Sequence, residues 1–301
     1  MKGRLSASTI ALLVAPPLFW AGNAVTARAL VGEFPPLALS FLRWALALAL
    51  IAPFAARAVW LHRATIRSQL GYFAAIGFLG VGCYNSLQYV ALQTSTAVNA
   101  TLIGASAPVV TSLLGAAFFS APIGRQQWIG ALLSALGVLV VIARGEPVNL
   151  LTLQFARGDL IMLVATATWS LYTWLLRARR TGVPLSASLT VQIAFGALMI
   201  LPFAVFEYAA TGQTAAPTAT NFAALLYIAL LPSLAAYFCW DRGVERAGAV
   251  LPMVFVNLTP VFAALLAWLF LAEPIGLHHL GGGALIIAGI AAASRTPRAR
   301  A

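Results

Sequence analysis

Charged residues are scarce in this sequence, and their scarcity excludes most classes of protein. Of 301 residues, 18 are Lys or Arg and 7 are Asp or Glu, so 8% of the chain is charged, against about 25% in soluble domains. Hydrophobic residues make up 61% of the chain, and the mean hydropathy is +0.93. A soluble fold of this length cannot hide so much apolar surface from water. Intrinsic disorder, collagen and a small disulfide scaffold are excluded by the same figures, so a lipid bilayer is the expected solvent.

The residues that usually build catalytic or metal sites are also few. The two cysteines, Cys83 and Cys239, form no CxxC pair and are expected to fill apolar space. His278 and His279 are adjacent, so they point to different faces of a helix and cannot bind a metal as an i, i+4 pair does. The run Gly281–Gly283 follows no strand, which favours close helix packing over phosphate binding. We therefore expect no cofactor, no metal and no enzymatic activity.

Long uncharged stretches divide the chain. The longest, between Arg67 and Arg125, holds 57 residues, which is enough for two membrane-crossing helices of about 20 residues each. A membrane β-barrel would need polar and apolar residues in strict alternation, and this pattern is missing. The first helix is expected to stay attached, because Asn23 lies where a signal peptide would need its cleavage motif. The sequence predicts an all-α integral membrane protein with ten transmembrane helices, at 8–28, 36–56, 70–91, 96–119, 125–143, 159–178, 185–206, 221–241, 247–271 and 277–294.

The basic residues fall mainly on one side of this predicted topology. With the N-terminus inside, the inner segments carry 14 Lys and Arg residues and the outer segments carry 3, while Arg43 lies within a helix. An excess of Lys and Arg in short loops marks the cytoplasmic side, so both termini are expected in the cytoplasm. The net charge of +11 reflects this topology, and nucleic acid is not an expected partner.

The second half of the chain repeats the first. A shift of 152 residues aligns Ala97–Gly137 with Ala249–Gly289 without a gap, and 13 of the 41 pairs are identical. The identical pairs include two prolines, three glycines and a Pro-Ile-Gly tripeptide, which shared apolar composition alone would not place in register. The halves are 1–149 and 150–301, with five predicted helices each. Because five is odd, the second half must enter the membrane inverted relative to the first.

Inverted five-helix halves are typical of carriers. Two copies in opposite orientation can exchange conformations, which opens a central site first to one side of the membrane and then to the other. Pro108 and Pro260 fall in mid-helix at equivalent positions of the two halves, and each is expected to bend its helix. The sequence leaves open whether these bends move during transport or are fixed kinks.

Several motifs give the chain the pattern of a known family. They are Phe19-Trp20-Ala21-Gly22-Asn23, Pro36 with Phe41-Leu42-Arg43-Trp44, the stretch from Thr96 through Pro108 to Pro122-Ile123-Gly124 and Gly130, and its counterpart ending Leu271-Ala272-Glu273-Pro274-Ile275-Gly276. With these the chain resembles the drug/metabolite transporter superfamily, specifically its ten-helix EamA-type carriers, over nearly its whole length. Within them it is similar to the broad-specificity and aromatic amino-acid exporters of the YddG type. The resemblance implies a carrier in a bacterial inner membrane, and its motifs are specific for the family but poor for the substrate.

Acidic residues are missing from the middle of the predicted helices. Those at outer ends are Glu33, Glu146, Asp159, Glu207 and Glu273, and those at an inner end are Asp241 and Glu245. The similar small multidrug-efflux proteins use an acidic residue in their first helix, and here that helix has none. Cation–proton antiport by that route is therefore disfavoured, and a facilitator, or coupling by another mechanism, is expected.

Polar and aromatic residues in mid-helix are the candidate substrate site, because small-molecule sites combine aromatic walls with a few placed polar groups. The candidates are Trp20, Asn23, Arg43, Tyr84, Asn85, Gln88, Asn99, Trp169, Tyr172, Tyr237 and Asn257. Trp20 and Trp169 are equivalent across the repeat at a shift of 149. Two other interpretations stay open: polar side chains also tie helices together, and aromatic residues near helix ends, such as Tyr84 and Trp240, also form belts at the membrane interface.

Arg43 has three possible roles. Its position, seven residues into its helix from Pro36, lies about 10 Å from the outer surface. An arginine at this depth needs compensation. It can reach outward to lipid headgroups, bond helix-end carbonyls as a structural tie, or hold a substrate carboxylate between the two arms of its guanidinium.

The expected function is the export of small metabolites, above all amino acids including aromatic or other hydrophobic ones, by alternating access. A carrier of nucleotide-sugars, sugar phosphates or drug-like compounds is the alternative, although phosphate would need several central Lys or Arg residues and Arg43 is the one candidate. A channel is compatible with the sequence, and a membrane enzyme would need a catalytic cluster that is not visible. The expected partners are a small-molecule substrate and the lipid bilayer. The oligomeric state stays open, a monomer included.

Overall fold

The protein folds into helices throughout the residues that the computed structural model describes, which are 5–30, 33–95, 97–121, 124–143, 146, 148–151, 156–212, 218–271 and 275–295. No strand occurs in these ranges. The elements are α1 Ala7–Ala29, α2 Pro36–Leu61, α3 Arg63–Ser68, α4 Leu70–Ile76, η1 Gly77–Cys83, α5 Tyr84–Ala91, α6 Ala97–Ala105, α7 Ala107–Phe118, α8 Arg125–Ile142, α9 Val148–Leu151, α10 Arg157–Ala178, α11 Leu185–Thr211, α12 Ala219–Ile228, η2 Ala229–Ala235, α13 Ala236–Ala247, α14 Val250–Val256, α15 Thr259–Leu271 and α16 Leu277–Ala293.

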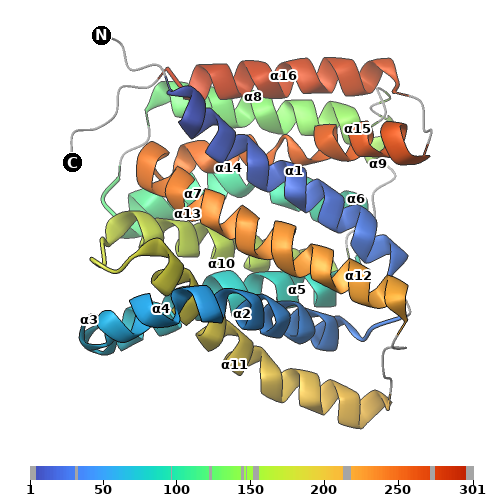
Figure 1. Cartoon of the computed structure of the whole chain (residues 1–301). Helices are drawn as coiled ribbons and strands as arrows, with labels where there is room; N and C mark the ends of the chain where they lie inside the picture. Colours follow the sequence, from blue (N-terminus) through green and yellow to red (C-terminus); the bar gives the residue numbers. More distant parts are fainter. Residues whose placement is uncertain are drawn as a thin grey trace.

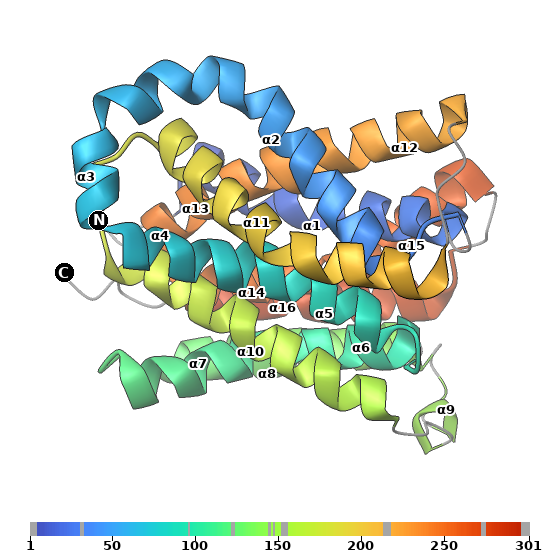
Figure 2. The same ribbon diagram turned by 90° about the horizontal axis from the view of Figure 1, so that it is seen from below.

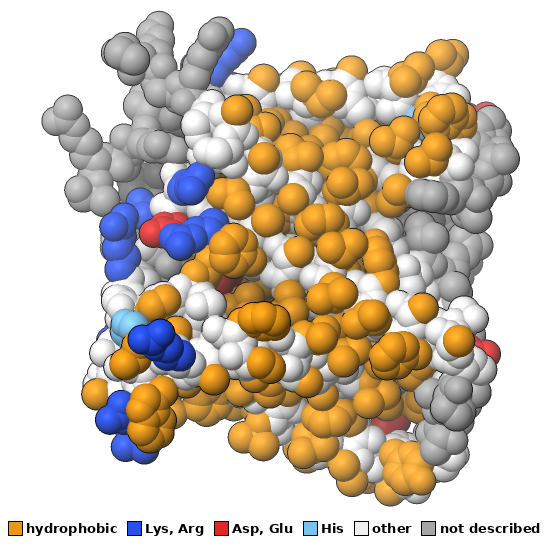
Figure 3. All heavy atoms as spheres, viewed as in Figure 1, with side chains coloured by type: hydrophobic (Ala, Val, Ile, Leu, Met, Phe, Trp, Pro, Cys, Tyr) orange, Lys and Arg blue, Asp and Glu red, His pale blue; other side chains and the backbone are white. Residues whose placement is uncertain are grey.

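The lengths and the surface of these helices are those of a membrane protein. Among the described residues, six helical stretches are long and apolar enough to cross a membrane: Pro36–Leu61, Leu70–Ala91, Arg125–Ile142, Arg157–Ala178, Leu185–Thr211 and Ala219–Ala247. Shorter apolar helices are Ala7–Asn23, Ala107–Phe118, Val250–Leu266 and Leu277–Ala293. Large apolar side chains point outward, and Phe54, Phe118, Phe206 and Leu277 are 73–88% exposed. Figure 3 shows apolar side chains spread over most of the face in view, a surface suited to lipid.

Helical residues fall in every range that the sequence predicted, and three helices end later than predicted. α2, α11 and α13 run to Leu61, Thr211 and Ala247, five or six residues beyond the predicted ends at 56, 206 and 241. The prediction stopped these helices near their charged residues, for example Arg57 and Glu207. A charge at the membrane surface does not prevent the backbone from continuing its helix into water, so these helices extend past the apolar run.

Most of the longer helices lie side by side and run in roughly the same direction (Figures 1 and 2). α8 packs against α16 at one edge of the molecule, and α2 packs against α11 at the opposite edge. α1, α5, α10 and α13 lie between these two pairs. α1 begins and α16 ends at the same end of the molecule, which is also the end where Figure 3 shows the blue Lys and Arg side chains.

The two prolines predicted to bend helices each stand at the start of a new helix. Pro108 is the second residue of α7 and Pro260 the second residue of α15. A proline has no amide hydrogen to donate and crowds the carbonyl one turn earlier, which favours a break just before it. α6 ends two residues before α7 begins, with Ser106 between them, and Asn257 and Leu258 separate α14 from α15. The helix is therefore interrupted at both places, where we expected a bend within a continuous helix.

Two segments, η1 and η2, are wound more widely than an α-helix. Both are π-helical and seven residues long, a geometry that is rare and often occurs at functional sites. In η2, Pro232 lacks an amide hydrogen, and the hydroxyl of Ser233 donates to the carbonyl oxygen of Ile228 at 2.8 Å. In η1, a Cβ on Gly77 would lie 2.6 Å from the carbonyl oxygen of Gln192 on α11. Glycine there allows α11 to approach the wide turn closely.

Paired glycines bring α8 and α16 into backbone contact. A Cβ on Gly130 would lie 2.5 Å from the carbonyl oxygen of Gly289, and a Cβ on Gly137 would lie 2.5 Å from that of Gly282. Small residues at a helix interface let two membrane helices approach closely and gain packing contacts that bulkier residues prevent. This contact fixes one edge of the molecule.

We expect Gly282→Ala to destabilise the protein and Gly281→Ala, one residue away on α16, to leave its stability unchanged. A Cβ at Gly282 would meet Val141 Cγ2 at 2.5 Å and the Gly137 carbonyl oxygen at 2.6 Å, whereas a Cβ at Gly281 meets nothing within 4 Å. Overpacking of this kind costs about 1–3 kcal/mol. Thermal unfolding in detergent measures the effect as a lower Tm for Gly282→Ala. Equal Tm values for the two variants would show that the contact is not tight.

Candidate functional site

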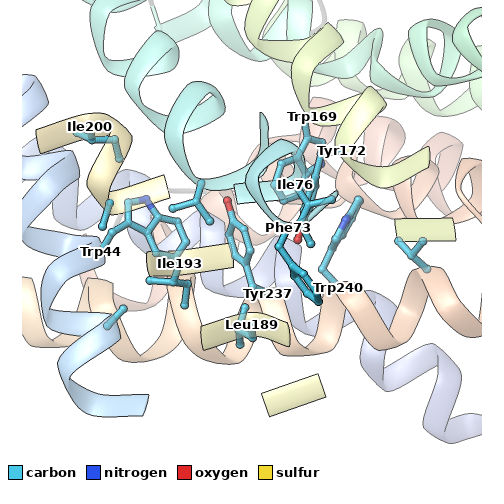
Figure 4. Close-up of a cluster of buried hydrophobic side chains, with 14 of the residues drawn as sticks. Trp44, Phe73, Ile76, Trp169, Tyr172, Leu189, Ile193, Ile200, Tyr237 and Trp240 are labelled. Carbon is cyan, nitrogen blue, oxygen red and sulfur yellow. The ribbon is translucent and has the colours of Figure 1, made fainter. Parts of the chain in front are cut away.

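Six aromatic rings meet in the interior of the molecule, and we call them the aromatic cluster: Trp20, Tyr84, Trp169, Tyr172, Tyr237 and Trp240. Trp169 is at the centre, with its ring 4.9–5.4 Å from the rings of the other five. Figure 4 shows Trp169 and Tyr172 beside Tyr237 and Trp240 in the core. Aromatic pairs at such separations attract each other in addition to burying apolar area. The cluster gives the interior an aromatic wall.

Four helices that are distant in sequence build this cluster. Trp20 comes from α1, Tyr84 from α5, Trp169 and Tyr172 from α10, and the last two rings from α13. Residues three or four apart on a helix share a face, which explains why α10 and α13 each contribute two rings. Trp240, which the sequence also allowed as a residue of the membrane interface, is 1% exposed and does not lie there.

Arg43 is buried at the edge of the cluster, with 1% of its surface exposed. Its guanidinium donates four hydrogen bonds: Nε to Ser233 Oγ at 2.6 Å, Nη1 to Asn85 Oδ1 at 3.1 Å and to Tyr89 OH at 3.3 Å, and Nη2 to the Pro232 carbonyl at 3.2 Å. All four acceptors are neutral. Among the described residues no carboxylate lies within salt-bridge distance of the guanidinium. The positive charge is therefore solvated by protein dipoles and has no counterion.

The carbonyl oxygen of Pro232 joins Arg43 to the aromatic cluster. It accepts from Arg43 Nη2 and also from the indole Nε1 of Trp20 at 3.1 Å. In a regular α-helix this oxygen would be used by an amide hydrogen of the next turn. Here, at Pro232 in η2, the oxygen accepts from these two interior side chains and holds both in place.

Asn85 and Tyr237 continue the hydrogen-bond chain. The Nδ2 of Asn85 donates to the hydroxyl of Tyr237 at 3.1 Å, and this hydroxyl donates to the carbonyl oxygen of Gly80 in η1 at 2.6 Å. Carbonyls from both wide turns thus fix site residues. Because these groups satisfy each other, Asn85 and Tyr237 hold the orientation of the Arg43 guanidinium.

A second polar centre lies around Asp241, which the sequence placed at an inner helix end. Its side chain is buried, with 7% of the residue exposed. Its Oδ1 accepts from the hydroxyl of Tyr172 at 2.8 Å, and its Oδ2 accepts from Nε2 of Gln192 at 3.1 Å. Sequence reasoning judged Asp241 by its distance from the end of the apolar run. Its spacing was the better signal, because Asp241 follows Tyr237 by four residues and so shares its inward face.

The remaining predicted residues lie around or away from the cluster. Asn23 is half-buried one turn beyond Trp20, and its Oδ1 has no hydrogen-bond partner in the described part of the chain. Gln88 is half-buried one turn beyond Tyr84 on α5. Asn257 is buried at the break between α14 and α15, where its Nδ2 donates to Ser134 Oγ at 2.8 Å, outside the aromatic cluster. The side chain of Asn99 lies outside the described part of the chain.

The indole of Trp44 adds an unused donor beside the site. Trp44 is fully buried, with its ring 4.9 Å from that of Tyr237 and 5.0 Å from Arg43 Cζ. Its Nε1 makes no hydrogen bond to the described residues. A buried donor without a partner costs free energy. The site therefore holds a buried cation, an aromatic wall and unpaired polar atoms, a combination suited to a ligand with an anionic group and an apolar group.

Comparison with known proteins identifies a common pattern over nearly the whole chain. Residues 7–143 and 156–295 match the EamA-like transporter family. The uncharacterized transporter YyaM of Bacillus subtilis is 27% identical over 89% of this chain and 87% of that protein. A probable terminal-alkyne amino-acid exporter of Streptantibioticus cattleyicolor is 28% identical over 74% of this chain and 72% of that protein. A crystal structure superposes with a TM-score of 0.76 over 96% of this chain and 97% of its own at 21% identity, which shows the same fold.

Proposed function

We propose that this chain, which belongs to the EamA-like transporter family, exports amino acids, including aromatic and other hydrophobic ones, by alternating access. Membership makes the protein a multi-pass membrane transporter of a small molecule, and it is not an enzyme. Both statements agree with the expectations drawn from the sequence. The amino-acid substrate, the outward direction and the bacterial inner membrane are our proposal, and the similarity to a probable amino-acid exporter supports the first two.

The buried charge of Arg43 is the observation that carries the proposed substrate. An arginine without a counterion in an apolar interior attracts an anion. Four of its five N–H groups bond protein acceptors, so one N–H of Nη2 is left to donate to a carboxylate. The aromatic cluster begins within two hydrogen bonds of this charge, through Asn85 and Tyr237. An amino acid has a carboxylate beside a side chain, so it can engage the arginine and the rings together.

The competing substrate classes fit the site less well. A sugar phosphate or nucleotide-sugar carries two or more negative charges, which calls for several buried cations. Arg43 is the one Lys or Arg residue that is buried in the described part of the chain. A drug-like apolar compound would contact the aromatic cluster but would provide no counterion for the buried Arg43 guanidinium.

Corresponding elements of the two halves support the proposal of ten spans in two inverted five-helix halves, 1–149 and 150–301. α2 and α11 begin at a shift of 149, each after a proline, Pro35 and Pro184. The wide turns η1 and η2 correspond at a shift of 152, as do the first residues of α7 and α15. A sequence repeat alone would not require irregular turns to fall at the same places, so this agreement favours a structural repeat.

Reciprocal contacts across the halves favour the inverted arrangement. Gly130 and Gly137 of α8 have their repeat counterparts in Gly282 and Gly289 of α16. Gly130 contacts Gly289 while Gly137 contacts Gly282, so exchanging the halves maps the contact onto itself. Such reciprocity is the property of a two-fold relation between the halves, and alternating access uses this relation.

Counterflow in liposomes tests the proposed function. Vesicles containing the purified chain and preloaded with unlabelled L-phenylalanine should take up external labelled L-phenylalanine transiently, at least tenfold above protein-free vesicles. Unlabelled substrate inside the vesicle stimulates uptake by a carrier because the binding site must return to the outer side after each transport step. A channel has no such return step, so it shows no stimulation. Preloading with uridine diphosphate glucose is the matched control and should give no stimulation. Stimulation by the nucleotide-sugar and not by the amino acid would replace our proposed substrate with the competing one.

A further inference from the structure

The proposed site leaves the buried carboxyl of Asp241 without a role. It lies on α13 directly before the exposed Arg242–Glu245 pair, whose charged atoms are 2.9 Å apart. The side chain of Asp241 is buried, whereas the side chains of Arg242 and Glu245 on the same helix are 42% and 47% exposed. Acidic residues inside membrane segments are costly, and they commonly mark ion or proton pathways.

The surroundings of this carboxyl are polar, and among the described residues no cation forms an ion pair with it. Its two hydrogen bonds come from the neutral groups Tyr172 on α10 and Gln192 on α11. Tyr72 on α4, Tyr237 on its own helix and Arg242 complete the titratable groups near it. The packed segments α14 and η2 contain no titratable residue. On α11 the ionisable residues, Glu207 and Tyr208, lie fifteen or more residues beyond Gln192, and on α10 Arg177 lies five residues beyond Tyr172. The described side chains of α1 include no ionisable group.

A single amino acid cannot use Arg43 and Asp241 together. Arg43 bonds Ser233, which precedes Asp241 by eight residues on the same continuous helical rod, a separation of about 12 Å at 1.5 Å per residue. The carboxylate and the ammonium group of an α-amino acid are attached to one carbon atom. Asp241 is therefore separate from the place where Arg43 would hold the substrate.

The hydroxyl of Tyr172 lies between two acceptors, and one of them is the Asp241 carboxyl. This hydroxyl has one proton and two acceptors in reach, Asp241 Oδ1 at 2.8 Å and Gln192 Oε1 at 3.1 Å. While Asp241 is ionised, the Tyr172 proton is held by its Oδ1. Once Asp241 is protonated, it is a weaker hydrogen-bond acceptor, so the Tyr172 hydroxyl can donate its proton to Gln192 Oε1 instead. Because Tyr172 packs on Trp169, with ring centroids 5.0 Å apart, the change reaches the aromatic cluster.

We propose that Asp241 is the proton-binding site through which the transporter uses a proton gradient, one proton binding to its carboxylate and being released from it in each cycle. This proposal rests on the proposed function in one respect, the identity of the substrate that is exchanged for the proton. A proton arriving from one side neutralises the carboxylate and lowers the cost of keeping it in the apolar interior while the site changes sides. Release to the other side restores the carboxylate, so protons move inward as substrate moves outward.

In the repeat, Asp241 and its partner Gln192 occupy the positions that are equivalent to Tyr89 and Arg43 in the first half. At the shifts that relate the halves, Gln192 corresponds to Arg43, and Asp241 corresponds to Tyr89. Arg43 donates to Tyr89 in one half, and Gln192 donates to Asp241 in the other. This pair of positions thus carries a fixed positive charge, Arg43, in the first half and a titratable carboxyl, Asp241, in the second. The first half would then bind the substrate and the second half the proton.

Asp241→Asn is the variant that tests the coupling. The amide has the shape of the protonated carboxyl and can still accept from Tyr172, but it cannot release a proton. In vesicles with a tenfold proton gradient, acid inside, the wild-type protein should accumulate labelled L-phenylalanine several-fold above equilibrium. Asp241→Asn should lose this accumulation and keep measurable counterflow. Glu245→Gln, an exposed residue one turn along the same helix, is the matched control and should accumulate as the wild type does.

A second measurement needs no substrate and separates failure of this proposal from failure of the proposed function. Infrared difference spectra of the protein in lipid, recorded between low and high pH, should contain the C=O stretching band of a buried protonated carboxyl. The band should be missing in Asp241→Asn and present in Glu245→Gln. Absence of this band in the wild type, or gradient-driven accumulation by Asp241→Asn, would overturn the proton site. Loss of wild-type counterflow with the band intact would instead refute amino-acid transport.

Discussion

We expect Arg43→Gln to reduce counterflow of L-phenylalanine by about tenfold to a hundredfold. Hydrogen bonds to a charged group contribute about 1.5–3 kcal/mol each, and each 1.4 kcal/mol is a factor of ten in affinity. Glutamine can still donate one hydrogen bond to the Ser233 hydroxyl or the Pro232 carbonyl, which Arg43 bonds now, but it gives the substrate carboxylate no positive charge. Arg43→Lys keeps the charge, loses the planar fork and should retain a fraction of the activity.

Two measurements separate this binding role from a structural one. The affinity for phenethylamine, which lacks the carboxylate, should be the same for Arg43→Gln and the wild type. The matched control is Arg57→Gln, an exposed arginine on the same helix, and it should transport normally. If Arg43→Gln moves phenylalanine at the wild-type rate, or if it loses phenethylamine binding together with its monodispersity in detergent, Arg43 is a structural tie between α2, α5 and η2.

Trp20→Ala and Trp169→Ala should each abolish transport of aromatic amino acids. Trp169 contacts every other ring of the cluster, and Trp20 is half-buried against Trp169 and Trp240. Loss of an aromatic contact costs about 0.5–1.5 kcal/mol beyond lost burial, and several such contacts are lost at once. The expected result is counterflow of L-phenylalanine at less than a tenth of the wild-type rate, with alanine transport reduced less.

Conservative and distant variants control for misfolding. Trp169→Phe keeps a ring at the centre and should recover part of the activity, because removing a buried tryptophan entirely costs about 3–5 kcal/mol in stability. Trp268→Ala removes a tryptophan that is 50% exposed on α15 and should leave transport intact. Normal transport by both Trp20→Ala and Trp169→Ala would remove the cluster from the substrate path.

The positions of the helices were predictable from the sequence because each membrane-spanning helix requires a long run of uncharged, apolar residues, which can be read directly along the chain. The uncharged runs located helical residues along the whole described chain, while the charged ends of α2, α11 and α13 were cut short. The wide turns were not predictable, since a π-helical segment such as Gly77–Cys83 has the same apolar composition as the α-helix around it. The breaks before Pro108 and Pro260 were predicted only as bends.

The site was predictable where residues share a helix face and unpredictable where the contact depends on packing between helices. Trp20, Trp169 and Tyr237 meet as their mid-helix positions indicated. The Ser134 contact of Asn257 and the Gln192 contact of Asp241 depend on which way each helix is turned. One sequence does not contain this rotation, because polar residues on a membrane helix can face any neighbour.

The wide turns have a consequence for how substrate preference can change. The acceptors that hold Trp20, Arg43 and Tyr237 are main-chain oxygens of Pro232 and Gly80, and such an oxygen persists whatever side chain its residue carries. Substitutions in the lining therefore leave the anchoring frame in place. In such a protein, substrate preference can change through the substitution of single aromatic residues, while the helices and their main-chain acceptors keep the same arrangement.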